Sequence, residues 1–414
     1  MANVDGPLTS KDFKITKLNI ITSSGINLSV LESYNQLQIF QSIYHGTMYG
    51  NIVITDAREA WSNFNFCGNE FVEIVADNPG LNRPFKRTFR IYKVTDRTTV
   101  SNSAQKAILH FCSDELMSSN SILVSKSYKN AKIRDIASDI LKNELKISSN
   151  RIAKLEDTLG NYDIIIPAKR PLEAISWATS RAYTQDKFCY FFFENKEGFN
   201  LVSLQTLMKQ KPYKTIKYEV KKVDSDPSKN KDGIDDFKIV NDFDSLTTLS
   251  NGGFSSRLLL VDVFSQSFKM TGYNLNNAES KNNLMNKFKP VNDVKNSRGE
   301  SLFDSPGSFF RMYPTVSATK TEKSNDIEYW YLPRALHMTI LNNFKIHVTI
   351  PGDIEMKAGD VVDVEFPMFE PGKDGGRAKN KRFSGKYLVA GLNYWGLFCV
   401  QSLAIQKSGM HFFI

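Results

Sequence analysis

The chain has 414 residues, of which 41% are hydrophobic and 23% charged, and its formal net charge is +9. This length predicts two to four domains with more than one core, and no segment approaches the ~20 apolar residues of a membrane-spanning helix, so we expect no stable membrane insertion. Lys and Arg are spread along the chain, which favours a soluble surface over a polyanion-binding stripe and leaves weak contact with DNA as the alternative.

Residues 1–120 begin with a polar segment, Met1 to Lys14, which predicts cytosolic synthesis. Short segments with alternating apolar and polar residues follow, and most are bounded by Gly, Asn, Asp or Pro. The candidate strands are Phe13–Thr22, Tyr34–Ile43, Tyr49–Thr55, Phe71–Ala76, Arg87–Val94 and Lys106–Cys112. They predict a first antiparallel β-barrel, with a strongly bent sheet as the alternative.

In residues 121–210 the apolar period changes to three and four residues. Ile133, Ile136 and Ile140 follow Asn130, a good N-cap, and predict a helix over 130–145 with one apolar face. A second helix begins at Pro171, and the phenylalanine-rich segments at 188–193 and 199–204 predict a hairpin. We therefore expect an α+β insertion domain here.

Residues 211–272 are expected to form the first part of a second barrel, with strands at Asp235–Asn241 and within Gly252–Phe268. Three polar stretches, one within this region and two after it, predict surface loops or mobile insertions. They are Lys221–Gly233, Asn274–Glu300 and Ser317–Asp326. Residues 273–328 are accordingly expected to be a polar loop insertion that splits the barrel.

Residues 329–414 are expected to complete the second barrel and to end in a C-terminal tail. A series of strands cut by Gly-Asp turns is predicted from Arg334–Leu336 to Ser384–Gly391, with alternation clearest in Phe344–Ile350. The segment Gly68–Ile74 resembles Gly359–Val364, and a Tyr-containing strand follows each copy. Chance similarity between hairpins is the alternative. A true repeat means a mainly β chain with two similar antiparallel barrels and an α+β domain.

Metal, cofactor and disulfide chemistry are not expected. The four cysteines lie in apolar strand-like runs without a C-x-x-C pair, which predicts reduced, buried thiols, and the five histidines have neither H-x-x-x-H spacing nor a nearby Cys ligand. His110 and His347 fall in strand patterns, where we expect them to be barrel-wall residues. The complete sets are Cys67, Cys112, Cys189 and Cys399, and His45, His110, His337, His347 and His411.

Carboxylate pairs are the remaining candidates for catalysis. A glycosidase needs one carboxylic acid with a raised pKa and a second carboxylate several ångströms away. Glu70 with Glu73, or Asp363 with Glu365, could supply the groups, but their strand contexts place them on or near a solvated face with ordinary pKa values. We therefore expect no catalytic residues and no enzyme.

Two C-terminal features suggest contacts with partners. The stretch Gly372–Arg382 has the glycines and cations of a phosphate cradle but lacks the GxxxxGK[ST] spacing, so it predicts a flexible hairpin loop that could touch an acidic partner or DNA. The final segment, Gly409–Ile414, ends in three large apolar residues. It is expected to dock on its own barrel or, preferably, on a neighbouring subunit.

The order of these pieces resembles the central hub proteins of contractile-phage baseplates, the torus of T-even-like tails, and the related hub half of type VI secretion spike proteins. The resemblance rests on the segment from Arg334 to Gly391, the block from Tyr128 to Leu204 and the strands that begin at Asp235. The loop over 274–326 and the basic loop near Arg377 match no motif of the family. Residues that face a lumen or a spike therefore cannot be carried over.

This resemblance implies a structural homotrimer in the tail baseplate of a virion, assembled in the host cytoplasm. Its six barrels would link a trimeric spike below to the hexameric tail tube or a tube-initiator ring above, and would form part of the DNA ejection channel. Tape-measure and baseplate wedge proteins are further implied neighbours. The alternatives are the hub of a secretion-type injection system and a tail-associated peptidoglycan hydrolase.

Overall fold

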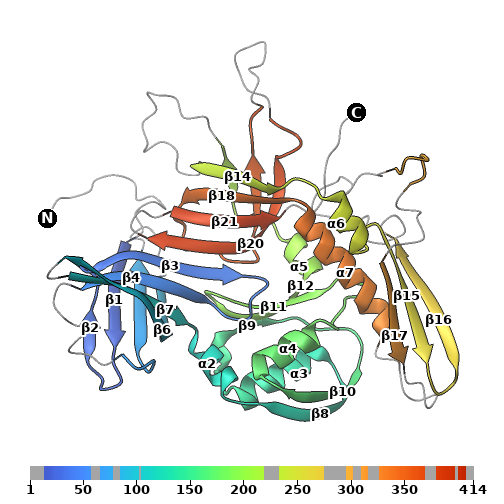
Figure 1. Ribbon diagram of the computed structural model, residues 1–414, viewed down its shortest axis with the longest axis horizontal. Helices are drawn as coiled ribbons and strands as arrows, with labels where there is room; N and C mark the ends of the chain where they lie inside the picture. The colour runs from blue at the N-terminus through green and yellow to red at the C-terminus, as the bar shows by residue number, and fades with distance from the viewer. Residues whose placement is uncertain are drawn as a thin grey trace.

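The computed structural model describes residues 14–56, 66–77, 84–101, 104–218, 233–274, 295–301, 309–315, 326–368, 379–396 and 400–406. The N-terminal part forms a curved sheet around its own apolar core (Figure 1). Its strands are β1 (Lys14–Ile21), β2 (Asn27–Ser29), β3 (Tyr34–Ser42), β4 (Tyr49–Asp56), β5 (Phe71–Asp77), β6 (Phe85–Ser101) and β7 (Ala104–Cys112). All six strands expected in this region are confirmed.

The α+β domain follows directly. Its elements are α2 (Asp114–Asn120), β8 (Val124–Ala131), α3 (Ile133–Asp139), the π-helix η1 (Ile140–Glu144), the 3-10 helix η2 (Ser149–Arg151), β9 (Ile152–Leu155), β10 (Tyr162–Lys169), α4 (Pro171–Thr179), β11 (Tyr190–Asn195), β12 (Gly198–Ser203) and α5 (Leu204–Lys209). The predicted helices and hairpin are confirmed. Asn130 is not the N-cap, because it lies inside β8 and Lys132 precedes the helix.

The second barrel assembles segments from both ends of the C-terminal half. Its strands are β13 (Thr215–Lys217), β14 (Asp236–Asn241), β18 (Lys345–Pro351), β19 (Val361–Glu365), β20 (Gly385–Gly396) and β21 (Val400–Gln406). Ile346, Val348 and Ile350 are each at most 1% exposed and alternate with more exposed neighbours. The predicted alternation in this strand is therefore confirmed.

The region between β14 and β18 differs from the sequence expectation. β15 (Ser255–Asp262) and β16 (Ser267–Asn274) were expected in the second barrel, but they form a separate sheet with β17 (Phe309–Thr315). Two helices accompany this side sheet, α6 (Ser245–Ser250) and α7 (Ile327–Asn343). Buried Leu258 and Leu260 of β15 belong to one cluster with Trp330 of α7, which explains why these strands leave the barrel.

Two further expectations for this region are wrong. Arg334–Leu336 is not a strand but lies in the middle of α7, where Pro333 weakens the helical signature. The insertion over 273–328 is not only loop, because it contributes β17. Most of the three predicted loops lies outside the described residues, as does the tail from Gly409 to Ile414. Among the described helices, none is long and apolar enough to cross a membrane.

The two barrels share one continuous sheet. The strand order is β14-β18-β21-β20-β3-β4-β7-β6-β5-β1-β2, with β19 also paired to β20 and β13 to β19. The link is the antiparallel pairing of β20 with β3, in which Tyr394 lies opposite Ile39. Figure 1 shows β20 and β3 side by side at the centre of the molecule. The junction is thus made of backbone hydrogen bonds between distant parts of the sequence.

The internal repeat predicted from sequence is visible in detail at the turns before β5 and β19. Gly68 and Gly359 both have positive φ, +89° and +95°, a conformation that glycine adopts without strain. Two residues after Gly68, Glu70 accepts a hydrogen bond from the Cys67 amide, and Asp360 after Gly359 accepts one from the Lys357 amide, both at 3.0 Å. The same turn therefore starts the same strand in both barrels.

Candidate functional site

The carboxylates proposed for hydrolysis do not form a catalytic pair. Glu70 is buried, which corrects the expectation of a solvated face. Burial alone would raise its pKa, but the amides of Cys67 and Gly68 outweigh that effect and lower it. The pKa of Glu73 is lowered chiefly by the Lys17 ammonium, 2.6 Å away. Both acids therefore have pKa values shifted away from what a general acid needs.

In the second barrel, Glu365 of the candidate pair Asp363 and Glu365 is held in ion pairs. Glu365 accepts a hydrogen bond from Lys379 at 2.9 Å and pairs with Lys217 at 3.4 Å, and the Lys379 bond is the main reason that its pKa is lowered. Lys379 belongs to the predicted basic loop, most of which lies outside the described residues. Arg382, at the loop's other end, pairs with Asp242. Lys379 and Arg382 of this loop thus pair with acids of the same chain.

The histidines take the positions that their surroundings allow. His110 and His347 lie in barrel strands β7 and β18, as predicted. His337 is buried in α7 and stacks on Phe188 with ring centroids 4.7 Å apart. Burial lowers the pKa of His337 to about 4. Within the described ranges, no group of three or more His, Cys, Asp or Glu residues is placed to hold a metal ion.

The thiols follow the prediction in two of three described cases. Cys112 and Cys189 are buried, and burial raises their pKa values to about 12 and about 11, which keeps them protonated and unreactive. Cys67 is exposed, which corrects the expectation that it is buried. Cys399 lies outside the described residues.

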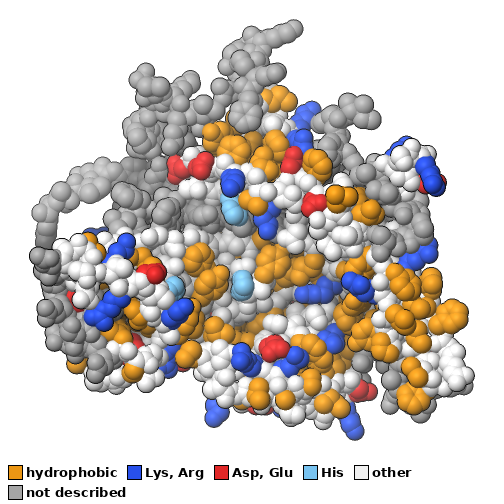
Figure 2. Space-filling view, viewed as in Figure 1, with side chains coloured by type: hydrophobic (Ala, Val, Ile, Leu, Met, Phe, Trp, Pro, Cys, Tyr) orange, Lys and Arg blue, Asp and Glu red, His pale blue; other side chains and the backbone are white. Residues whose placement is uncertain are grey.

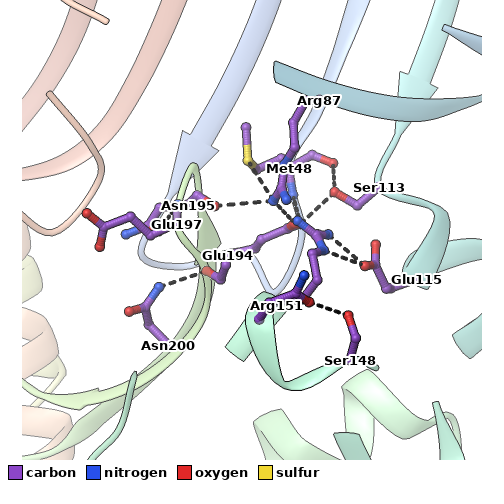
Figure 3. A network of polar contacts seen from close by, with 12 residues as sticks. Met48, Arg87, Ser113, Glu115, Ser148, Arg151, Glu194, Asn195, Glu197 and Asn200 are labelled. Carbon is purple, nitrogen blue, oxygen red and sulfur yellow. Dashed lines mark hydrogen bonds and ion pairs between the residues drawn. The ribbon is translucent and has the colours of Figure 1, made fainter. Parts of the chain in front are cut away.

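The most elaborate polar site connects the first barrel to the α+β domain. Glu194 lies near the end of β11, just before the turn of the β11–β12 hairpin. Its side chain is fully buried and accepts hydrogen bonds from four groups (Figure 3). Arg87 of β6 and Arg151 of η2 contact one carboxylate oxygen at 2.6 and 2.8 Å. The Met48 amide and the Ser113 hydroxyl contact the other at 2.9 and 2.5 Å. We call these five residues the Glu194 cluster.

The charges of the Glu194 cluster are balanced by one more acid. Arg151 also donates to Glu115 of α2 at 2.6 Å, so two guanidinium groups meet two carboxylates. Burial, and next the nearby Glu194 charge, raise the pKa of Glu115 to about 7, and burial raises that of Glu194. The arrangement fixes one domain on another. All four contacts to the Glu194 carboxylate hold it in one position, while Arg151 Nη1 is buried without a hydrogen-bond partner among the described residues.

Sequence reasoning missed the Glu194 cluster because its members are far apart in the chain. The one local signal was a single acid at the end of the run Phe191–Phe193, where a charge would be costly without partners. The hairpin that carries Glu194 is buried on both faces. Phe192 packs in the core of the α+β domain, whereas Phe191 and Phe193 pack with Ile43 and Ala390 beside the β3–β20 junction.

One apolar surface stands out in Figure 2, where hydrophobic side chains gather over the β15–β17 sheet. Phe268, Met270 and Met312 are 76%, 54% and 64% exposed. Met270 and Met312 flank Leu259 in the strand register, so they occupy one face of the sheet. Exposed apolar surface of this kind is typical of protein–protein contact sites.

The fold is similar to that of phage tail proteins. The tail protein from Neisseria meningitidis MC58 is 12% identical, with a TM-score of 0.53, and the match covers 95% of this chain and 97% of that one. The 43 kDa tail protein of prophage MuSo2 from Shewanella oneidensis is 8% identical, with a TM-score of 0.54, and the match covers 95% and 98%. No protein-family model and no curated protein matches the sequence. The chain thus shares its fold with these proteins over nearly its whole length.

Proposed function

We propose that the protein is a structural hub of a contractile tail baseplate, in which three copies form a ring of six barrels. The observation that carries this proposal is the joining of two barrels of the same strand order, edge to edge, within one chain. A duplicated barrel lets a trimer present six similar units. Such a ring can face a hexameric tail tube on one side and a trimeric spike on the other.

The mechanism in this proposal is mechanical. Thrust on one barrel passes to the next through the β3–β20 ladder, whose hydrogen bonds share a load applied along the strands. The Glu194 cluster keeps the α+β domain from turning on the first barrel. The ring leaves a central passage for DNA, and no catalytic step is required. The likeness in fold to phage tail proteins supports a role in the tail.

The absence of enzymatic activity is part of the proposal. Glu70, Glu73 and Glu365 all have lowered pKa values, which suits structural ion pairs and not a general acid. Purified protein is expected to release no fragments from peptidoglycan. Release that disappears with Glu70→Gln would instead favour the hydrolase alternative.

The decisive experiment is a measurement of mass and shape on the full chain. Light scattering is expected to give three times the 47.0 kDa chain mass, and negative-stain images are expected to show rings with a central opening. A chain that stays monomeric at all accessible concentrations would overturn the hub proposal.

A further inference from the structure

The two barrels correspond around one shared β-bulge, although β6 has two further register shifts against β7, between Thr95 and Thr98 and between Thr99 and Ser101, that β20 lacks against β21. In β6 the register against β7 shifts between Ile91 and Lys93, and in β20 the register against β21 shifts between Val389 and Gly391. The amide of Ile91 donates to the Glu70 carbonyl at 2.9 Å, and the amide of Val389 donates to the Asp360 carbonyl at 2.8 Å. Ile91 is therefore the counterpart of Val389. β6, β7, β4 and β3 correspond to β20, β21, β18 and β14.

This correspondence shows that only one of two equivalent junctions is formed within the chain. After its bulge, β20 runs past β19, and Gly391–Gly396 pairs with β3. After its own bulge, β6 runs past β5 in the same way, but the segment Lys93–Ser101 pairs only with β7 among the described strands. β14, the counterpart of β3, likewise pairs only with β18 in the described part of the chain.

The unmatched edges also carry incompletely buried apolar side chains. Leu37 of β3 and Leu392 of β20 are 4% and 3% exposed at the formed junction. Their counterparts are Phe237 of β14, which is half-buried, and Val94 of β6, which is 37% exposed. The same apolar positions are therefore more fully buried where the junction exists than where it does not.

We propose that the part of β6 beyond its bulge, around Thr98, pairs antiparallel with β14 of a second copy, so that the junction made by β20 and β3 within one chain is repeated between chains. An unpaired edge is a template for another strand, and here the internal copy of the junction specifies the partner. This inference deepens the ring proposal above and rests on it. It adds which edges meet and in which register.

The register follows from the formed junction. Trp395 lies opposite Gln38 there. Trp395 also lies opposite Val400 of β21, and Thr98 lies opposite Lys106 of β7. Because Lys106 and Val400 are counterparts, Thr98 corresponds to Trp395. Gln38 corresponds to Lys238 by the same reasoning through β4 and β18. Thr98 of one copy is thus expected opposite Lys238 of the next.

Disulfide cross-linking tests this register in the full chain. In a background with the four native cysteines replaced by serine, Thr98→Cys with Lys238→Cys is expected to give covalent species of up to three chains on oxidation. Thr98→Cys with Asp236→Cys, two residues out of register, is expected to cross-link at least five-fold less. Phe40→Cys with Asn393→Cys is the matched control, because these residues face each other within the chain and should cross-link without an increase in mass.

The outcomes separate this inference from the ring proposal. A chain with trimeric mass in which the 40–393 pair cross-links and the 98–238 pair does not would overturn the β6–β14 junction and leave the ring standing. Equal cross-linking of the in-register and out-of-register pairs would overturn the register and with it the inferred junction. A monomeric mass would overturn the ring proposal itself, and the junction that rests on it.

Discussion

Removing the charge of Glu194 should loosen the α+β domain from the first barrel. In Glu194→Gln the side chain keeps its size, but two guanidinium groups lose their shared carboxylate, and the new amide NH₂ group faces donors from Arg87 or from Met48 and Ser113. Breaking a buried ion pair from one side costs about 3–5 kcal/mol. Because Arg151 keeps Glu115 at 2.6 Å, we expect the lower end, about 3 kcal/mol.

The measurement is thermal unfolding followed by calorimetry. For a cooperative unit of roughly 150–250 residues, each kcal/mol corresponds to about 2–4 °C, so Tm should fall by about 6–12 °C. Glu173→Gln is the matched control, because Glu173 pairs with Lys169 on an exposed helix face, and no measurable change is expected. Equal Tm values for the two variants would refute the view that the Glu194 cluster anchors the domain.

Three further predictions concern single positions. Val348→Asp should lower the free energy of unfolding of the second barrel by at least about 3 kcal/mol, because it buries an unpaired charge. In urea unfolding, His347→Asp on the exposed face of the same strand should leave the midpoint nearly unchanged. His337 has a pKa of about 4 in the folded protein and about 6.5 in the unfolded chain. Its contribution to the free energy of unfolding should therefore be complete above pH 6.5 and should fall by up to about 3 kcal/mol as the pH drops to 4. His337→Phe should remove this loss when unfolding is measured as a function of pH. Gly50→Ala should lower the free energy of unfolding by about 1–3 kcal/mol, because its Cβ would lie 2.1 Å from the Gln38 carbonyl oxygen; an unchanged urea midpoint would contradict that packing.

Local patterns predicted the strands well because their signal is itself local. The alternation that places Ile346 and Val348 inside the second barrel is readable from a few consecutive residues, and so is the helix that begins at Pro171. The pairing partners of a strand are not encoded in this way. β15 has a strand pattern that suits a barrel or a side sheet equally, and only the apolar face of α7, some 70 residues later, decides between them.

Polar partners were the least predictable part of the site. Glu70 was expected to be solvated because of its short polar strand context, yet the turn before the strand folds its amides onto the carboxylate, which is buried. Arg87, Arg151 and Glu194 come from three separate elements. Nothing near any one of them indicates the others, because charge complementarity between distant segments arises only after the fold has brought them together.

The two kinds of junction in this chain suit different mechanical tasks. The β3–β20 ladder has main-chain partners at successive positions, so it tolerates substitution of side chains and can be repeated between copies with a different sequence, such as Thr98 opposite Lys238. The Glu194 cluster depends on particular side chains, so it fixes one domain in one orientation. A ring built from like barrels needs a ladder that tolerates different side chains at each junction, and an appended domain needs only a cluster that fixes its orientation.

The β11–β12 hairpin connects the ladder and the cluster, because Phe191 and Phe193 support the ladder while Glu194 holds the domain. Loss of the cluster should therefore loosen the domain before it opens the proposed ring.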